Sequence, residues 1–318
     1  MARRDRSPEE LFAAAQAGDR AALARLLSLI ERGGDNARAV GRLSYPLGGT
    51  AYTVGLTGAP GAGKSTLTSA TIGHVRSLGN EVAVLAIDPS SPFSGGAILG
   101  DRVRMQDHAT DPGVFIRSMA TRGHLGGLSL ATPEAVRLLD ALGHELVLIE
   151  TVGVGQVEVE IAGKADTTVV VVNPGWGDAV QANKAGLMEI ADIFVINKAD
   201  RKGVDDTRRD LEQMLELSQL GDWRPPIIPT VASQGEGIET FWNAVSDHRA
   251  HITASGELER RRERRLREEL REIIVRRLEM RAREICTGDR WDDLETGVAR
   301  RKVDPWAAAD EMLKGVGA

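Results

Sequence analysis

The chain has 318 residues, of which 42% are hydrophobic but only 4% aromatic, so Leu, Val, Ile and Ala must fill a sizeable core. Its 40 basic and 46 acidic residues give a net charge of -6, which does not indicate nucleic acid or an anionic membrane as a partner. The single cysteine, Cys286, excludes an internal disulfide and a multi-cysteine metal site. With no apolar signal core and no run long enough to span a bilayer, we expect a cytoplasmic protein.

Residues 1–49 are predicted to form a pair of helices. Ser7-Pro8-Glu9-Glu10 has the form of a capping box with proline at the first helical position. Gly18 can end that helix and Asp19 can cap a second one. Gly33-Gly34 is expected to close the segment. The apolar residues of the second helix repeat at helical spacing: Leu23, Leu26, Leu27 and Ile30.

Residues 50–252 alternate apolar runs with helical patterns, which predicts a three-layer α/β domain with a mostly parallel sheet. Runs such as 168–172 are continuously apolar, as expected of strands covered on both faces. One helix is predicted to follow Thr132-Pro133 and to end before Gly143, and another follows Asp205. The predicted strands are 52–57, 82–87, 114–117, 145–149, 168–172, 193–196 and 226–230.

Residues 253–318 are predicted to be a C-terminal helical region. The stretch 256–286 lacks proline and mixes Arg with Glu, which argues against a nucleic-acid arm. Its apolar stripe fits two interpretations, a solvated helix packed on its own domain or a dimerisation helix. The stripe comprises Leu266, Leu270, Ile273, Ile274 and Leu278.

A phosphate-binding loop is predicted at Gly58–Ser65, which reads G-x-x-x-x-G-K-S between a predicted strand and a predicted helix. Its glycines let backbone N–H groups turn toward phosphate, and the helix N-terminus favours an anion. Lys64 is expected to reach the β- and γ-phosphates, and the Ser65 hydroxyl to ligate Mg²⁺. The predicted nucleotide contacts here are Gly58, Ala59, Pro60, Gly61, Ala62, Gly63, Lys64, Ser65 and Thr66.

The base is predicted from Asn197-Lys198-Ala199-Asp200, which follows an apolar run at 193–196. A carboxylate at the end of such a strand can accept both the ring N–H and the exocyclic amine of guanine. Adenine lacks that pair of donors, and a buried carboxylate facing it would lose roughly 1–3 kcal/mol or more. Together with the phosphate loop, Asn197, Lys198 and Asp200 predict a GTP/GDP site.

Acidic residues that end strands or lie in the following loops are candidate Mg²⁺ ligands with Ser65: Asp88, Asp101 and Glu150. Glu150 starts Glu150-Thr151-Val152-Gly153, where many GTPases have Asp, and its extra methylene favours a water-mediated contact. Each could alone be an ordinary loop-capping residue, but their shared placement favours a site. Gln156 is a candidate for orienting the attacking water, with helix capping or a partner contact as alternatives. The predicted catalytic set is Lys64, Asp88, Glu150 and Gln156.

Further stretches match one known family in order: Asp88–Ser91, Gly95–Arg102, Thr121–Gly127, Glu150–Gln156 and Glu189–Asp200, with Gly18–Ala21 and Asp304–Trp306 at the two ends. On these motifs the chain resembles the MeaB/ArgK group of P-loop GTPases, of the SIMIBI class, over nearly its whole length. The resemblance implies a homodimeric GTPase that gates cobalamin loading and protects an adenosylcobalamin-dependent acyl-CoA mutase, such as methylmalonyl-CoA mutase. Slow basal hydrolysis that rises with the partner is expected.

The resemblance also places Asp88, Asp101 and Glu150 around Mg²⁺ and makes Gly177–Lys184 a mobile switch. Within that switch Gln181 and Lys184 lie one helical turn apart and would report the nucleotide state across a subunit interface; a solvated helix face is the alternative. Val231, Ala232 and Ser233 stand where Ser-Ala-x is usual, a mild change if backbone N–H groups contact guanine O6. The departure at 173–176 leaves the choice of mutase open.

Two other functions fit the same loop. A metal-insertion GTPase usually carries a Cys/His site, but one Cys and 6 scattered His give no convincing ligand spacing. A small-molecule kinase, the old label for some relatives as amino-acid transport kinases, would fit the phosphate loop alone. The Asn197–Asp200 motif argues against ATP and therefore against that reading.

Overall fold

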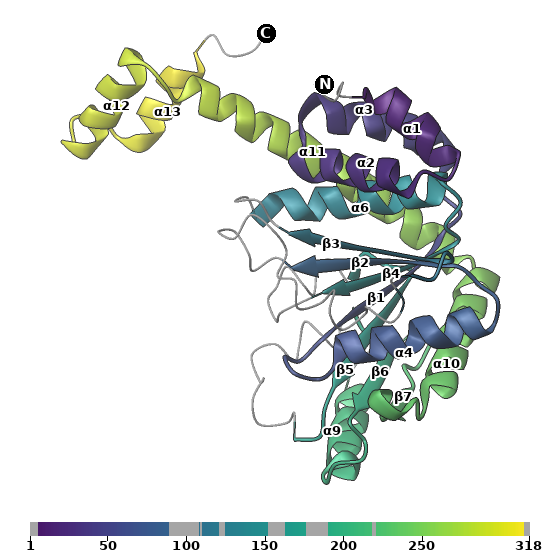
Figure 1. The fold of residues 1–318 in the computed structure, drawn as a ribbon. Coiled ribbons are helices and arrows are strands. Elements are labelled where there is room, and N and C mark those ends of the chain that lie inside the picture. The colour runs from purple at the N-terminus through teal and green to yellow at the C-terminus, as the bar shows by residue number, and fades with distance from the viewer. Residues whose placement is uncertain are drawn as a thin grey trace. The chain divides into compact units, whose positions relative to one another are not determined.

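The computed structural model describes residues 6–88, 108, 110–120, 125–151, 163–175, 190–217 and 221–314. At residues 88, 120 and 125–130 it describes the backbone alone. The chain divides into two compact units, Met1–Arg262 and Glu263–Ala318 (Figure 1).

The first unit is built on a 7-stranded sheet with the order β3-β2-β4-β1-β5-β6-β7, in which every pair of neighbours is parallel. β1, which leads into the glycine-rich loop, lies at the centre. All seven predicted strands are present, and the parallel sheet confirms the predicted α/β fold. The strands are β1 Tyr52–Gly58, β2 Val82–Asp88, β3 Val114–Ala120, β4 Leu146–Thr151, β5 Thr167–Val172, β6 Ile193–Asn197 and β7 Ile227–Thr230.

Helices cover both faces of the sheet (Figure 1). Successive residues of β2 point to opposite faces, so Val84 packs in one hydrophobic cluster and Leu85 in the other. The first cluster holds α4 (Lys64–Ser77), α9 (Val204–Leu217) and α10 (Ile238–Ala254); the second holds the N-terminal helices and α6 (Leu125–Ala141). Burial on both faces explains why these strands read as continuous apolar runs.

The N-terminal segment contains three helices where the sequence predicted two: α1 Pro8–Gln16, α2 Arg20–Arg32 and α3 Gly34–Ser44. The capping box is confirmed, with the Glu10 N–H donating to Ser7 Oγ at 3.2 Å and the Ser7 N–H to Glu10 Oε2 at 3.1 Å. Gly33, at φ +71°, ends α2 as expected. The pair Gly33-Gly34 turns the chain rather than closing the segment, because α3 starts at once and packs through Ala37 and Val40.

The predicted start of α6 is wrong, because the helix begins at Leu125 and includes Pro133. Proline usually costs a helix interior about 3 kcal/mol, so Thr132-Pro133 reads as a helix start. Here α6 is buried in the second hydrophobic cluster, together with α2, through Ala131, Ala135, Leu138 and Leu139. That packing keeps the helix continuous through the proline.

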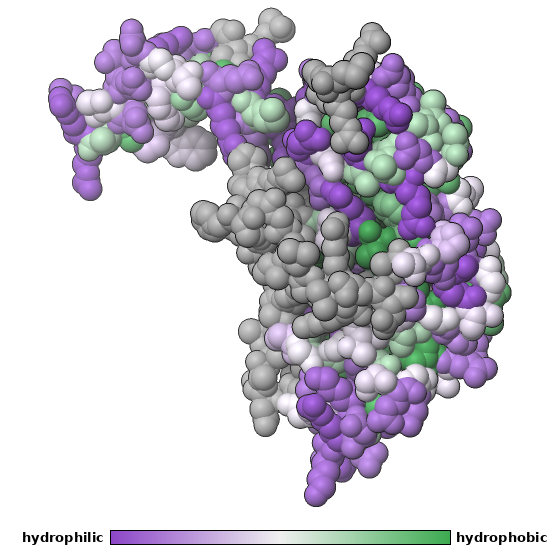
Figure 2. Space-filling model, in the orientation of Figure 1, coloured by the Kyte–Doolittle hydropathy of each residue, from purple (hydrophilic) through white to green (hydrophobic). Residues whose placement is uncertain are grey.

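Helix α9 has the amphipathic character that was predicted. It buries Thr207, Leu211 and Leu215 and carries charged residues on its other sides. Figure 2 shows the end of the first unit at α9 as a hydrophilic surface. Among the described residues, every helix is too short or too polar to cross a membrane.

The C-terminal helices are α11 Glu257–Ile285, α12 Asp289–Ala299 and α13 Pro305–Leu313. The apolar stripe predicted on α11 is present, and within this chain most of it is exposed: Leu266 at 44%, Leu270 at 60%, Ile274 at 49% and Leu278 at 61%. Helix α13 is capped by Asp304, whose carboxylate accepts from the N–H groups of Trp306 and Ala307.

Candidate nucleotide site

The glycine-rich loop lies where the sequence predicts it, between the end of β1 at Gly58 and the start of α4 at Lys64. Gly63 is the N-cap of α4 with φ +91°, and no side chain of the described residues caps this helix end. The first N–H groups of α4 are therefore directed at the loop, where an anion is favoured.

Two positions in the loop require glycine. A Cβ on Gly58, which has φ +131°, would lie 2.0 Å from the Val171 carbonyl oxygen. A Cβ on Gly63 would lie 2.5 Å from Asn197 Nδ2. Contacts below 3 Å with backbone or with a held amide cannot be relieved by small shifts, so the loop packs tightly against β5 and β6.

Lys64 is held inside the loop. Its ammonium donates to the carbonyl oxygens of Gly58 at 2.8 Å and of Ala59 at 3.3 Å, and the residue is only 7% exposed. A cation buried at the mouth of an uncapped helix supplies the charge that a phosphate chain needs.

The Ser65 hydroxyl donates to Glu150 Oε1 at 2.5 Å, and both residues are buried. The contact arises because Glu150 on β4 pairs in register with Leu56 on β1, just before the loop. A hydroxyl and a carboxylate are the hard oxygen donors that Mg²⁺ prefers, so this pair fits a magnesium site. Among the described residues, no group of three or more His, Cys, Asp or Glu side chains could hold a metal ion.

Asn197 ties the base-reading motif to the phosphate loop. From the end of β6 its Nδ2 donates to the Ala62 carbonyl oxygen at 2.8 Å. Its Oδ1 accepts from Thr230 Oγ1 and from the Ala232 N–H, both at 3.1 Å. The side chain is buried, so one amide holds three chain segments in a fixed arrangement.

Lys198 adds a second link to the same loop. It adopts φ +60°, which non-glycine residues rarely adopt, and its ammonium donates to the Gly61 carbonyl oxygen at 2.5 Å. The Ala199 N–H donates to the Thr230 carbonyl oxygen at 2.9 Å, which fixes the turn that carries Asp200. Asp200 itself is exposed.

The structure thus brings together Gly58–Thr66, Glu150, Asn197–Asp200 and the Val231–Ser233 turn. Asp88 ends β2, where only its backbone is described. Asp101, Gln156, Gln181 and Lys184 lie outside the described residues.

Thr230 is a site residue that the sequence reasoning missed. It ends β7 and lies in register with Asn197 at the end of β6, which places its hydroxyl next to the Asn197 amide. The signal that could have identified it is a polar residue, Thr230, at the end of the predicted strand that follows the Asn197 strand in the sequence. In the 231–233 turn the Ala232 N–H donates to Asn197 Oδ1.

A parallel sheet with a strand–loop–helix phosphate site, braced by an Asn-Lys-x-Asp turn, defines a P-loop GTPase. The model of one such family, the methylmalonyl Co-A mutase-associated GTPase MeaB, matches residues 23–286, and the chain belongs to that family. The family predicted from the sequence motifs is therefore confirmed.

Several known proteins resemble the chain over most of its length. A putative GTPase of Pyrococcus abyssi is 50% identical over 97% of this chain and 96% of its own. GTPase ArgK of Escherichia coli is 39% identical over 77% of each chain. A crystal structure described as a LAO/AO transport system kinase superposes with a TM-score of 0.73 at 27% identity, covering 99% of both chains.

Proposed function

We propose that this GTPase acts as a chaperone of an adenosylcobalamin-dependent acyl-CoA mutase, with methylmalonyl-CoA mutase the foremost candidate. GTP hydrolysis to GDP and phosphate would time cofactor loading and protection of the mutase. The observation that carries the proposal is membership of a family whose description names that mutase. The site geometry supports a nucleotide switch, because the base motif and the phosphate loop are joined through Asn197.

In this proposal Lys64 and the N-terminus of α4 bind the phosphates, and the carboxylate of Asp200 selects guanine. Ser65 and Glu150 hold Mg²⁺ together with Asp88 and Asp101. When bound, the ion neutralises charge that develops on the phosphate oxygens. Gln156 orients the attacking water.

Gln181 and Lys184 report the nucleotide state between subunits. The subunits pair through the apolar stripe of α11, whose exposure supports a homodimer. The molar mass of the chain in solution tests this pairing.

Replacing Glu150 with Gln is expected to weaken Mg²⁺ affinity in the nucleotide complex by about 10- to 100-fold. The amide keeps an oxygen that accepts the Ser65 hydroxyl, so the fold is retained while the negative charge is lost. A Mg²⁺ titration of GDP dissociation measures the effect. Glu145→Gln, an exposed residue just before β4, is the matched control. Equal Mg²⁺ dependence in both variants would remove Glu150 from the metal site.

Purified protein is expected to hydrolyse GTP slowly, and an added acyl-CoA mutase should raise the rate at least about tenfold, as partners do for other GTPases. Phosphate release is measured with and without the mutase, and with Lys64→Ala to exclude a contaminating phosphatase. An unchanged rate together with no binding to any acyl-CoA mutase would reject the chaperone role.

The same preparation tests the alternatives. Tight ATP binding with weak GDP binding, together with transfer of phosphate to a small molecule, would indicate a kinase. Stoichiometric nickel or zinc would indicate metal delivery.

A further inference from the structure

Two consecutive arginines in the first turns of α11 grip buried carboxylates. Arg262 binds Asp166 through Nη2 to Oδ2 at 2.8 Å and Nε to Oδ1 at 3.2 Å. Arg261 Nη1 lies 3.0 and 3.1 Å from the two oxygens of Asp192. Asp166 is 1% exposed and Asp192 6%, so these pairs are far better shielded than surface ion pairs. We call the four residues the arginine clamp.

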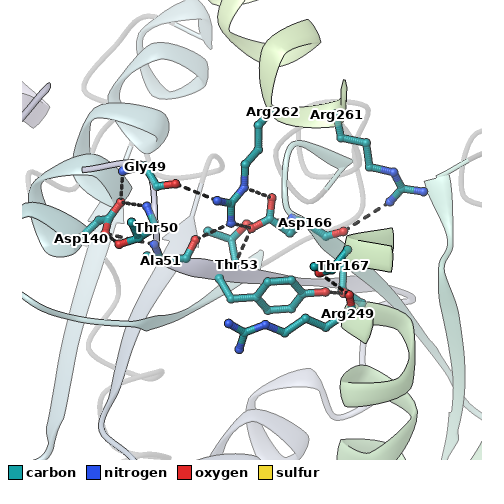
Figure 3. Close-up of polar contacts among 12 residues, drawn as sticks. Gly49, Thr50, Ala51, Thr53, Asp140, Asp166, Thr167, Arg249, Arg261 and Arg262 are labelled. Carbon is teal, nitrogen blue, oxygen red and sulfur yellow. Dashed lines mark hydrogen bonds and ion pairs between the residues drawn. The ribbon is translucent and has the colours of Figure 1, made fainter. Parts of the chain in front are cut away.

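Arg262 also holds the chain that enters β1. It donates through Nη1 to the Gly49 carbonyl oxygen at 2.7 Å and through Nη2 to that of Ala51 at 2.8 Å. Asp140 of α6 accepts from the N–H groups of the same stretch, including Thr50 and Ala51 at 3.0 Å each. Figure 3 shows Arg262 and Asp140 on either side of this stretch, with Asp166 beside Arg262.

The carboxylates of the clamp stand at the starts of strands. Asp166 immediately precedes β5 and accepts from the Thr53 N–H of β1 at 3.0 Å. Asp192 immediately precedes β6 and accepts from the Thr168 N–H at 2.8 Å. The clamp therefore fixes the first residues of β1, β5 and β6 to α11.

The far ends of these same strands form the nucleotide site. β1 ends at Gly58, and β6 ends at Asn197. Near the end of β5 the Val171 carbonyl oxygen accepts from the Ala59 N–H at 3.1 Å and leaves no room for a Cβ on Gly58. The three strands are fully buried, and each spans about 15–25 Å.

A second buried chain of polar groups stiffens the clamp. Burial is the main reason why the pKa of Tyr52 is raised to about 12, and its hydroxyl forms a hydrogen bond with Thr167 Oγ1 at 2.5 Å. Thr167 in turn forms a hydrogen bond of 2.8 Å with His248 Nδ1. His248 Nε2 lies 3.2 Å from Asp192 Oδ1 but makes no hydrogen bond within the described residues. These hydrogen bonds add a buried polar link between the start of β1, the start of β5 and α10.

We propose that the arginine clamp positions the nucleotide site from the opposite ends of the same strands. Docking of the first turns of α11 and nucleotide binding are then thermodynamically coupled. Close-packed strands pass small displacements on rather than absorbing them. A shift at Asp166 or Asp192 then reaches the tight contacts around Gly58 and Asn197. Linkage is reciprocal. Loosening the docking of α11 therefore weakens nucleotide binding, and bound nucleotide strengthens the docking of α11.

The coupling rests on the guanine site and is tested on the full chain with Arg261→Gln and the milder Arg262→Lys. Arg260→Gln is the matched control, because Arg260 is largely exposed and, in the part of the chain that the structure describes, bonds to Glu257 and Ser255 of its own neighbourhood. GDP and a nonhydrolysable GTP analogue are titrated well below the melting temperature. Hydrogen exchange of amides 258–266 is followed with and without nucleotide.

We expect GDP affinity to fall by about 5- to 10-fold in the two clamp variants and to be unchanged in the control. In the wild type, nucleotide should slow exchange in 258–266. The coupling would be overturned if the clamp variants bound GDP as tightly as the control, even if they melt at a lower temperature. It would also be overturned if nucleotide left hydrogen exchange at 258–266 of the wild type unchanged. The wild-type exchange needs no variant, so poor folding cannot hide the answer. Failure of the wild type to bind GDP would instead reject the proposed nucleotide-timed chaperone function.

Discussion

Asp200→Asn is expected to weaken GDP and GTP binding by about 10- to 150-fold and to give the protein affinity for xanthine nucleotides. Hydrogen bonds to a charged group contribute about 1.5–3 kcal/mol, which corresponds to that loss. In the proposed role the Asp200 carboxylate accepts two N–H donors of guanine. An amide offers one acceptor and one donor, which matches the ring N–H and the added carbonyl of xanthine. The turn that carries Asp200 is held by the backbone, so the substitution leaves its geometry in place.

Competition of GDP, XDP and ADP against a fluorescent nucleotide measures the change. The control is Asp205→Asn, because Asp205 is an exposed acid in the first turn of α9 and the same charge is lost there. Unchanged guanine selectivity in the Asp200 variant would refute the base-reading role. Loss of affinity for all nucleotides, without a gain of affinity for xanthine nucleotides, would mean that the turn itself had moved.

The sheet could be predicted from the sequence because burial on both faces makes each strand a continuous apolar run. β5, Thr167–Val172, is an example, with every residue buried. The phosphate loop and the base motif could be predicted because their residues are consecutive in the chain. Such local patterns carry both the residue types and their geometry.

Contacts between distant segments could not be predicted in this way. Arg262 lies 213 residues from Gly49, and nothing in an Arg/Glu-rich helix marks it as different from Arg260, two residues before it. The link between Asn197 and Thr230 depends on the register of β6 and β7, which the sequence leaves open. The predicted helix start at Pro133 failed for a related reason, because packing of α6 on the sheet outweighs local helix signals.

The strongest effect on both stability and binding is expected at Asn197. Its buried amide donates to the Ala62 carbonyl oxygen and accepts from Thr230 and the Ala232 N–H. Asn197→Ala leaves these groups without a partner in the interior and should cost about 2–5 kcal/mol of unfolding free energy. Nucleotide affinity should fall with it, because the phosphate loop and the 231–233 turn are no longer joined.

Asn197→Asp separates the role of the amide as a donor from its role as an acceptor. It keeps the acceptor for Thr230 and Ala232 but sets a carboxylate oxygen against the Ala62 carbonyl oxygen, 2.8 Å from the present nitrogen. Two acceptors repel at that distance, so we expect nucleotide affinity to drop at least as far as in Asn197→Ala. Asn243→Ala is the matched control, because Asn243 is an exposed residue of α10. Denaturant unfolding without nucleotide and GDP titration measure the two effects separately. If Asn197→Asp bound GDP as the wild type does, the link to the phosphate loop would have no part in holding the site.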